Sequence, residues 1–300
     1  MKKETMIKET MIKGYALVIL SAFLFGCMPL ITRYIYADGV NETSMVFLRN
    51  LLALPPLALL AWREEKSFKI PMKAVPAMTA LALLGNCATA LLLYCSYQYI
   101  PTGTASVFHY VYPAVVVLLG VVFLRMEIQA GALLAIGMCV VGIGLFYDPE
   151  VTLDWGGCAL ALGSGVCYAI YIVILAAFPY KEITSFKLNF YITAICTVIM
   201  LIVCLVSGGL TLPSSLTGWL LCILLAVTMS VGAVVMFQQG TFLIGGERAS
   251  VLSTVEPLTG LVIGLLVFHE ETTPGMLVGS ALVIAACILI AVFDKKRLES

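Results

Sequence analysis

The apolar residues of this chain occur in runs of about twenty, the length that an α-helix needs to cross roughly 30 Å of hydrocarbon. The mean hydropathy is +1.06 and only 11% of the residues are charged, whereas about a quarter of a soluble domain is charged. We therefore predict an all-α integral membrane protein that has almost no sequence left for a soluble domain. The formal net charge of zero gives no sign of a nucleic-acid partner.

Proline, glycine and charged residues divide the apolar sequence into ten candidate spans. The first run is too long for the core of a signal peptide, and "CMPLITRYI" after it has no small-residue cleavage site, so we expect this helix to be retained. The ten spans are predicted at 14–36, 44–62, 74–97, 103–124, 128–147, 155–178, 185–206, 216–243, 249–268 and 274–293.

The charges between these spans predict their direction. If the chain begins in the cytoplasm, the inner segments hold Lys2, Lys3, Lys8, Lys13, Arg63, Lys66, Lys69, Lys73, Arg125, Lys181, Lys187, Arg248, Lys295, Lys296 and Arg297. The outer loops hold Asp38, Glu42, Asp148, Glu150, Asp154, Glu270 and Glu271 instead. Because cytoplasmic loops carry the excess of Lys and Arg, we predict a multi-pass protein of the cell (inner) membrane with both termini cytoplasmic.

An internal repeat relates the two halves of the chain. "GTASVFHYVYPAVVVLLGVVFLRMEIQAG" at 103–131 resembles "ERASVLSTVEPLTGLVIGLLVFHEETTPG" at 247–275, and "GYALVILSAFLFG" aligns with "GCALALGSGVCYA". We predict two five-helix repeats at 14–147 and 155–293, flanked by cytoplasmic segments at 1–13 and 294–300. A repeat with an odd number of spans enters the membrane from opposite sides, so the two repeats are expected to be inverted, as in many secondary transporters.

These motifs are similar to those of the drug/metabolite transporter superfamily, specifically its EamA-type members with ten spans. The resemblance rests on "MVFLRN" at 45–50, "GTASVFHYVYP" at 103–113, "ERASVLSTVEP" at 247–257, and the glutamates Glu127, Glu270 and Glu271. It implies an alternating-access carrier with a central cavity between the halves and peripheral fifth and tenth helices. In one departure, the first repeat has Tyr112 where the second has Glu256.

Glu256 is a carboxylate inside an apolar segment. A charged carboxylate in hydrocarbon costs at least about 2.5 kcal/mol, so the side chain must face protein or a water-filled cavity, or be protonated. In a continuous helix, Ala249, Ser253, Glu256 and Gly260 would share one face of small and polar residues. This pattern favours a proton-coupling site, and a structural hydrogen bond to a neighbouring helix is the alternative.

His109 lies in the corresponding helix of the first half. The repeat maps it onto Ser253 and maps Tyr112 onto Glu256, so both faces are expected to line one cavity. A histidine there could relay protons or contact the solute, or it could be a neutral ring bonded to a neighbour.

Further polar side chains are candidates for lining the cavity. Arg49 lies about five residues inside the second span, where it could attract an anionic group of the solute or serve as an anchor at the helix end. Hydroxyls and amides in apolar helices either bind a polar solute or join helices. These candidates are Ser21, Asn86, Tyr94, Tyr97, Tyr168, Tyr171, Gln238, Gln239 and Ser253.

The ten cysteines all lie in apolar segments and form no CxxC pair, so we expect small packing residues and no metal site. No cofactor is predicted either. The intramembrane-enzyme alternative lacks its motifs, since "HEETT" at 269–273 is not HExxH and no pair of aspartates lies inside a span. A passive scaffold would not require a buried acid, histidine and glutamine at repeat-related positions.

The sequence therefore predicts a secondary transporter that is not an enzyme, with a small-molecule solute and the lipid bilayer as its partners. Proton-coupled export of amino acids or related compounds is the preferred prediction. Facilitated exchange of a phosphorylated or nucleotide-type solute remains the alternative, although such solutes would favour several Lys or Arg residues at the midplane. The oligomeric state, with a homodimer as one option, is left open.

Overall fold

A computed structural model of the chain describes residues 2–124, 130–145, 154–180, 182–207, 209–253, 255–269 and 273–299. Every regular element within these ranges is helical. The first half contains α1 (Lys2–Gly26), α2 (Met28–Ala37), α3 (Glu42–Glu65), η1 (Met72–Ala74), α4 (Val75–Leu81), η2 (Ala82–Ala88), α5 (Thr89–Ser96), α6 (Thr102–His109), α7 (Tyr112–Leu124) and α8 (Ala130–Gly144). The second half contains α9 (Trp155–Ala176), α10 (Ser185–Val206), α11 (Leu216–Leu225), η3 (Ala226–Ala233), α12 (Val234–Ile244), α13 (Gly246–Leu252), α14 (Val255–Leu266) and α15 (Pro274–Glu299).

Seven helical segments among the described residues are long and apolar enough to cross a membrane. They are Thr10–Ala37, Glu42–Glu65, Met72–Ser96, Thr102–Gly120, Trp155–Ala176, Ser185–Val206 and Leu216–Ile244, and each corresponds to a predicted span. The predicted spans at 128–147 and 274–293 correspond to shorter apolar helices, Leu133–Gly142 and Pro274–Ala286. The predicted span at 249–268 corresponds to two short helices, α13 and α14. The structure therefore confirms a helical protein with several spans, and the full number of ten stays a prediction.

Side chains placed before the helices fix several of their starting points. The Asn41 side chain accepts a hydrogen bond from the Ser44 backbone N–H at the start of α3. Thr184, one residue before α10, accepts from Lys187 in the same way, and Asp154 accepts from Gly157 before α9. Such caps satisfy N–H groups that have no partner within the helix.

The two halves repeat their irregularities as well as their helices. The elements η2 and η3 are π-helical stretches that begin at Ala82 and Ala226, 144 residues apart. Within the described residues, the chain is interrupted after His109 and again after Leu252, in each case shortly before a proline. Proline lacks the N–H that an inner helical turn requires. The predicted spans at 103–124 and 249–268 are therefore each divided, and Glu256 lies in the first turn of α14.

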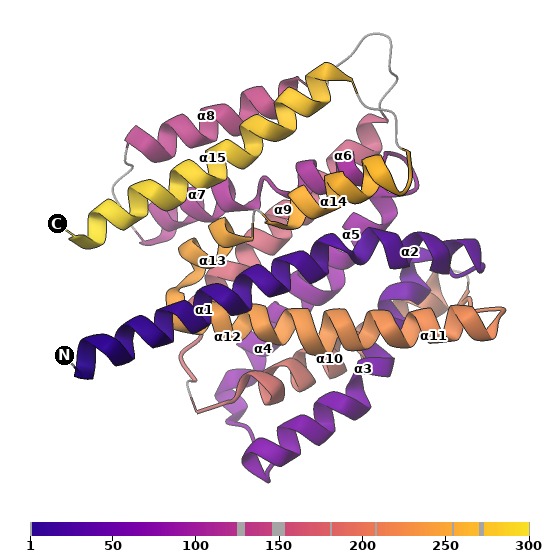
Figure 1. Cartoon of the computed structure of the whole chain (residues 1–300). Helices are drawn as coiled ribbons and strands as arrows, with labels where there is room; N and C mark the ends of the chain where they lie inside the picture. The colour runs from indigo at the N-terminus through magenta and orange to yellow at the C-terminus, as the bar shows by residue number, and fades with distance from the viewer. Residues whose placement is uncertain are drawn as a thin grey trace.

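The corresponding helices α3 and α10 of the two halves pack side by side and run antiparallel. The Asn41 N–H at the start of α3 donates to Thr211 Oγ1 beyond the end of α10. At the other end, the Thr184 N–H before α10 donates to Glu65 Oε1 at the end of α3. Figure 1 shows α3 and α10 at one edge of the bundle and α8 beside α15 at the opposite edge, with both chain termini at one end.

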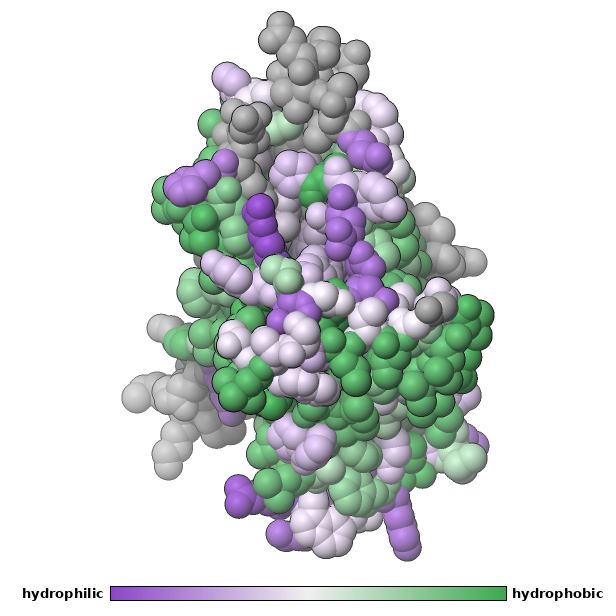
Figure 2. All heavy atoms as spheres, turned by 90° about the vertical axis from the view of Figure 1, so that its right-hand side faces the viewer, coloured by the Kyte–Doolittle hydropathy of each residue, from purple (hydrophilic) through white to green (hydrophobic). Residues whose placement is uncertain are grey.

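The outer surface of the helices is apolar. Large exposed side chains include Ile19 and Phe23 on α1, Val198 and Leu205 on α10, and Leu220 on α11. Figure 2 views one end of the bundle, where hydrophilic side chains gather across the middle and apolar side chains lie on the flanks. Apolar flanks with polar ends are the arrangement that a bilayer requires.

Candidate functional site

A cavity lies between the two halves and is lined from both. Both halves contribute to its wall, through α1, α2, α3, η2, α5 and α6 on one side and α9, α12 and α14 on the other. The lining residues are Phe25, Met28, Arg49, Gly85, Asn86, Thr89, Ala90, Leu93, His109, Tyr168, Tyr171, Val234, Phe237 and Glu256.

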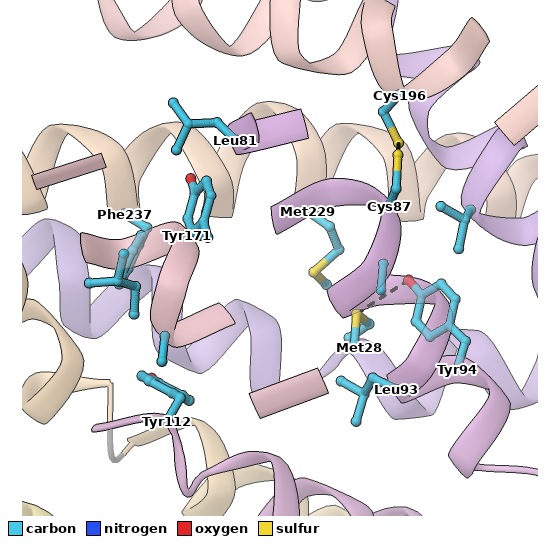
Figure 3. Close-up of a cluster of buried hydrophobic side chains, with 14 of the residues drawn as sticks. Met28, Leu81, Cys87, Leu93, Tyr94, Tyr112, Tyr171, Cys196, Met229 and Phe237 are labelled. Atoms are coloured by element: carbon cyan, nitrogen blue, oxygen red, sulfur yellow. Dashed lines mark hydrogen bonds between the residues drawn. The ribbon is translucent and has the colours of Figure 1, made fainter. Parts of the chain in front are cut away.

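Aromatic rings form much of the wall on the side of the second half. The rings of Tyr168 and Tyr171 on α9 stack with centroids 5.6 Å apart, and Tyr168 also meets Phe237 of α12 at 5.8 Å. Gln238 Nε2 donates to the Tyr171 hydroxyl at 3.3 Å. Figure 3 shows Tyr171 and Phe237, which come from separate helices. These contacts hold large flat surfaces in place on the cavity wall.

Arg49 of α3 is buried, with 5% of its surface exposed. Its Nη1 donates to the Tyr94 hydroxyl at 3.3 Å, and that hydroxyl donates to Met28 Sδ (Figure 3). Arg49 Nε has no hydrogen-bond partner. Among the residues that the structure describes, no carboxylate forms an ion pair with Arg49. A permanently charged guanidinium therefore reaches the cavity with only a neutral partner.

His109 ends α6 and is also buried. Its Nδ1 lies 2.6 Å from the Ser164 hydroxyl oxygen, and that hydroxyl donates its single proton to the Ala161 carbonyl. The serine can then only accept from the ring, so the geometry assigns the proton to Nδ1 and leaves Nε2 as an acceptor. His109 is thus oriented by α9, in the second half of the chain.

Glu256 is the only acidic residue among the residues that line the cavity. Its backbone N–H donates to the Ser253 carbonyl at 2.9 Å across the interruption between α13 and α14. The described residues provide no hydrogen-bond partner for its carboxyl group. The cavity therefore contains one acid, one histidine and one arginine.

The π-helix η2 brings small and polar residues to the cavity. Asn86 donates through Nδ2 to Asn50 Oδ1 at 3.3 Å, and the hydroxyl of Thr89, the first residue of α5, donates back to the Leu84 carbonyl of η2 at 2.6 Å. A side chain on Gly85 would overlap the ring of Tyr171, since an added Cβ would lie 2.3 Å from that ring. π-Helical turns are frequent at functional sites, and here one widens the helix beside the cavity.

The sequence model of the EamA-like transporter family matches residues 12–147 and again residues 155–292. Each half of the chain thus contains one copy of the family's domain. The chain belongs to this family. An uncharacterized transporter of Archaeoglobus fulgidus is 25% identical over 277 residues, covering 92% of this chain and 95% of that protein. An uncharacterized transporter of Synechocystis is 24% identical over 314 residues, covering 92% of each chain.

A solved crystal structure has the same fold, with a TM-score of 0.62 at 13% identity, and the match covers 96% of this chain and 99% of the other. At this identity the likeness shows the fold alone. Family and relatives together make the chain a multi-pass membrane transporter, and they point away from an enzyme.

The cavity of this EamA-like transporter includes Arg49, Asn86, His109, Tyr168, Tyr171 and Glu256 from among the predicted residues. Others lie behind the wall. Tyr94 and Gln238 are buried and support Arg49 and Tyr171. The Ser21 hydroxyl donates to the Ala233 carbonyl and so joins α1 to η3.

Three remaining candidates also lie outside the lining of the transporter's cavity. The Ser253 hydroxyl donates to the Ala249 carbonyl of its own helix. The Tyr97 ring lies 6.2 Å from the Tyr94 ring, and Gln239 is half-buried on α12. The expected face of Ala249, Ser253 and Glu256 is divided by the interruption, so these residues do not act as one stripe.

The sequence prediction missed the apolar part of the wall, above all Phe25, Met28 and Phe237. Apolar side chains in a membrane helix look the same whether they face lipid or a cavity. The repeat contained the missing signal, because Phe25 and Met28 correspond to Tyr168 and Tyr171, 143 residues later.

Proposed function

We propose that this transporter works by alternating access between two inverted five-helix repeats, which together form ten spans. The antiparallel packing of α3 against α10 supports the inversion, because these helices hold equivalent places in the two halves. The division of α6 from α7 and of α13 from α14 supports it as well. Interrupted helices next to a site at the repeat interface are typical of such carriers.

The solute is a small metabolite, and export of amino acids or related compounds fits the wall best. The lining offers amide and hydroxyl groups, aromatic surfaces, one cation and one acid. A zwitterionic solute could pair its two charges with the cation and the acid of this site, and a neutral solute would bring no charge that needs a partner. The cell membrane with both termini cytoplasmic is the proposed location, and the chain ends at the same end of the bundle agree with it (Figure 1).

The single observation that carries proton coupling is the position of Glu256. Its carboxyl lines a cavity shared by both halves and has no hydrogen-bond partner among the described residues. A carboxyl in this environment can take up a proton when the solute is absent. It can release the proton when the cavity opens to the other side of the membrane. His109 lines the same cavity and offers a second acceptor at Nε2.

The experiment is transport by the purified protein in liposomes that contain a pH-sensitive dye. We expect the wild type to move an amino acid from a panel together with protons, and Glu256→Gln to lose at least tenfold in rate together with the proton signal. Glu64→Gln on the exposed end of α3 is the matched control and should behave as wild type. Full activity and unchanged pH dependence in Glu256→Gln would remove Glu256 as the coupling site.

Facilitated exchange of an anionic solute is the second candidate, and Arg49 favours it because a buried guanidinium attracts anions. An exchanger requires solute on both sides of the membrane, whereas a proton-coupled carrier does not. Uptake into liposomes loaded with or without the same solute therefore separates the two. Uptake that occurs only into loaded liposomes would favour exchange.

A further inference from the structure

We propose that Arg49 binds the carboxylate of the transported solute, and that the solute is a small compound with one carboxylate group and an apolar body. This inference rests on the proposed function, since it names the class of solute that the central cavity accepts. From the sequence alone, Arg49 could either contact the solute or serve as an interfacial anchor. The inference assigns it the first of these roles.

The surroundings of Arg49 exclude the role of an interfacial anchor. An anchor extends its charge into water, whereas Arg49 is 5% exposed and its Nη1 is held by Tyr94 on α5. The guanidinium carbon also lies 5.8 Å from the centre of the Tyr94 ring. The side chain is therefore held in one position beside the cavity.

The charge of Arg49 is not matched by the protein around it. Arg49 Nε has no acceptor, and the described residues give Nη1 only an uncharged hydroxyl. The guanidinium stays charged and presents several N–H groups in a fixed plane, a geometry that matches the two oxygens of a carboxylate. A carboxylate in the cavity would supply the missing acceptors and the missing negative charge.

The rest of the wall favours a carboxylate over a phosphate. Arg49 is the only Lys or Arg among the residues that line the cavity, so a doubly charged phosphate would keep one charge unpaired. Phe25, Met28, Leu93 and Phe237 offer an apolar surface for the body of the solute. Glu256 lines the same cavity and would accept a hydrogen bond from an ammonium group if the solute is an amino acid.

The experiment is equilibrium binding to the purified full chain in detergent, by calorimetry and by shift of the melting temperature. The probes are glycine, valine, leucine and phenylalanine, their deaminated carboxylic acids, the amide of each compound, and inorganic phosphate. We expect at least one carboxylate of the panel to bind, at least tenfold more tightly than its own amide, and phosphate not to bind. Comparing each amino acid with its deaminated acid tells whether the ammonium group contributes.

The variants assign the preference to Arg49. Arg49→Gln should lose the discrimination between carboxylate and amide, Arg49→Lys should keep part of it, and Glu64→Gln should keep all of it. If Arg49→Gln does not fold, the comparison of carboxylate with amide in the wild type still decides, because it uses no variant. No binding by any carboxylate of the panel, equal binding of the amides, or discrimination that survives in Arg49→Gln would each overturn the proposal.

The same measurement separates this inference from the proposed proton coupling. Binding in detergent requires neither transport nor a proton gradient, so Glu256→Gln should still prefer carboxylates. Carboxylate binding at Arg49 without proton movement in liposomes would contradict proton coupling and support the role of Arg49. Proton-coupled transport of solutes that lack a carboxylate would support the coupling and contradict the role of Arg49.

Discussion

The two halves contribute to the cavity in different ways when residues at equivalent repeat positions are compared. The apolar and aromatic wall is shared, because equivalent positions line the cavity in both halves. The pairs are Phe25 with Tyr168, Met28 with Tyr171, Ala90 with Val234, and Leu93 with Phe237. The shape of the cavity thus follows the repeat of the chain.

The charged and titratable groups do not follow the repeat. Arg49 corresponds to Ile192, His109 corresponds to Ser253, and Glu256 corresponds to Tyr112. Only Arg49, His109 and Glu256 of these line the cavity. The apolar wall has equivalent residues in both repeats, so both halves offer the solute a similar surface. A charged or titratable group that occurs in one repeat only binds one end of the solute and so gives it one orientation. The comparison predicts that substitutions at the single groups change transport and that substitutions at their equivalents do not.

After the loss expected for Glu256→Gln, the largest difference between equivalent positions is expected for the pair His109 and Ser253. His109→Gln removes the ring that Ser164 orients and the acceptor Nε2, and we expect transport in liposomes to fall about tenfold. Ser253→Ala removes a hydroxyl that is bonded within its own helix, so its transport should match that of the wild type. Equal losses in both variants, or none in His109→Gln, would contradict a functional difference between the halves.

A second prediction concerns a glycine that only one half requires. Gly165 of α9 corresponds to Ala22 of α1, and a Cβ on Gly165 would lie 2.3 Å from the His109 carbonyl oxygen. We expect Gly165→Ala to destabilise the protein by about 1–3 kcal/mol, because α9 and the backbone at His109 would have to move apart. Thermal unfolding in detergent measures the effect.

Gly163→Ala on the same helix is the matched control for Gly165→Ala. Its Cβ would lie 3.6 Å from Leu92 Cδ1, which is an ordinary contact. Its melting temperature should therefore equal or exceed that of the wild type, because alanine favours the helix. A similar loss in both variants would mean that the close approach of α9 to His109 is not what demands glycine at 165.

The membrane class and the family were predictable because both depend on properties spread over the whole chain. Apolar runs and the Ala-Ser-Val and Pro positions of the repeat do not require knowledge of which way a side chain points. The two interruptions were not predicted, although a proline follows each of them, at 113 and 257. Arg49, His109 and Glu256 were found because charged or titratable groups are rare inside membrane helices.

The detailed shape of the cavity could not be predicted in this way. The π-helices η2 and η3 depend on a shift in backbone hydrogen bonding that no particular residue marks. Ser253 was expected in the cavity because a continuous helix would place it beside Glu256, and the interruption separates them. The direction of a side chain after a helix break depends on tertiary packing that local sequence does not specify.

The smallest effect is expected at one end of the bundle, where the halves are joined through Asp38. Its carboxylate accepts from the Ser215 N–H at 3.1 Å and from the Ser214 hydroxyl at 3.0 Å, so the end of α2 is attached to the start of α11. These hydrogen bonds, those from Ser215 first, lower the pKa of Asp38 from its ordinary value of 3.8. At the opposite end, the halves are joined instead by the ion pair of Lys187 with Glu65, at 2.6 Å.

A lowered pKa means that the folded protein binds the proton of Asp38 less readily than the unfolded chain does. The stability that Asp38 contributes is therefore present above pH 3.8 and is lost as the pH falls through the lowered pKa. We expect Asp38→Asn to melt slightly below the wild type at about pH 7, and the difference to shrink as the pH falls below about 4. Glu64→Gln removes an exposed carboxylate on α3, so this variant should match the wild type at both pH values. A difference between Asp38→Asn and the wild type that stays constant or widens on acidification would show that the carboxylate charge does not hold α2 to α11.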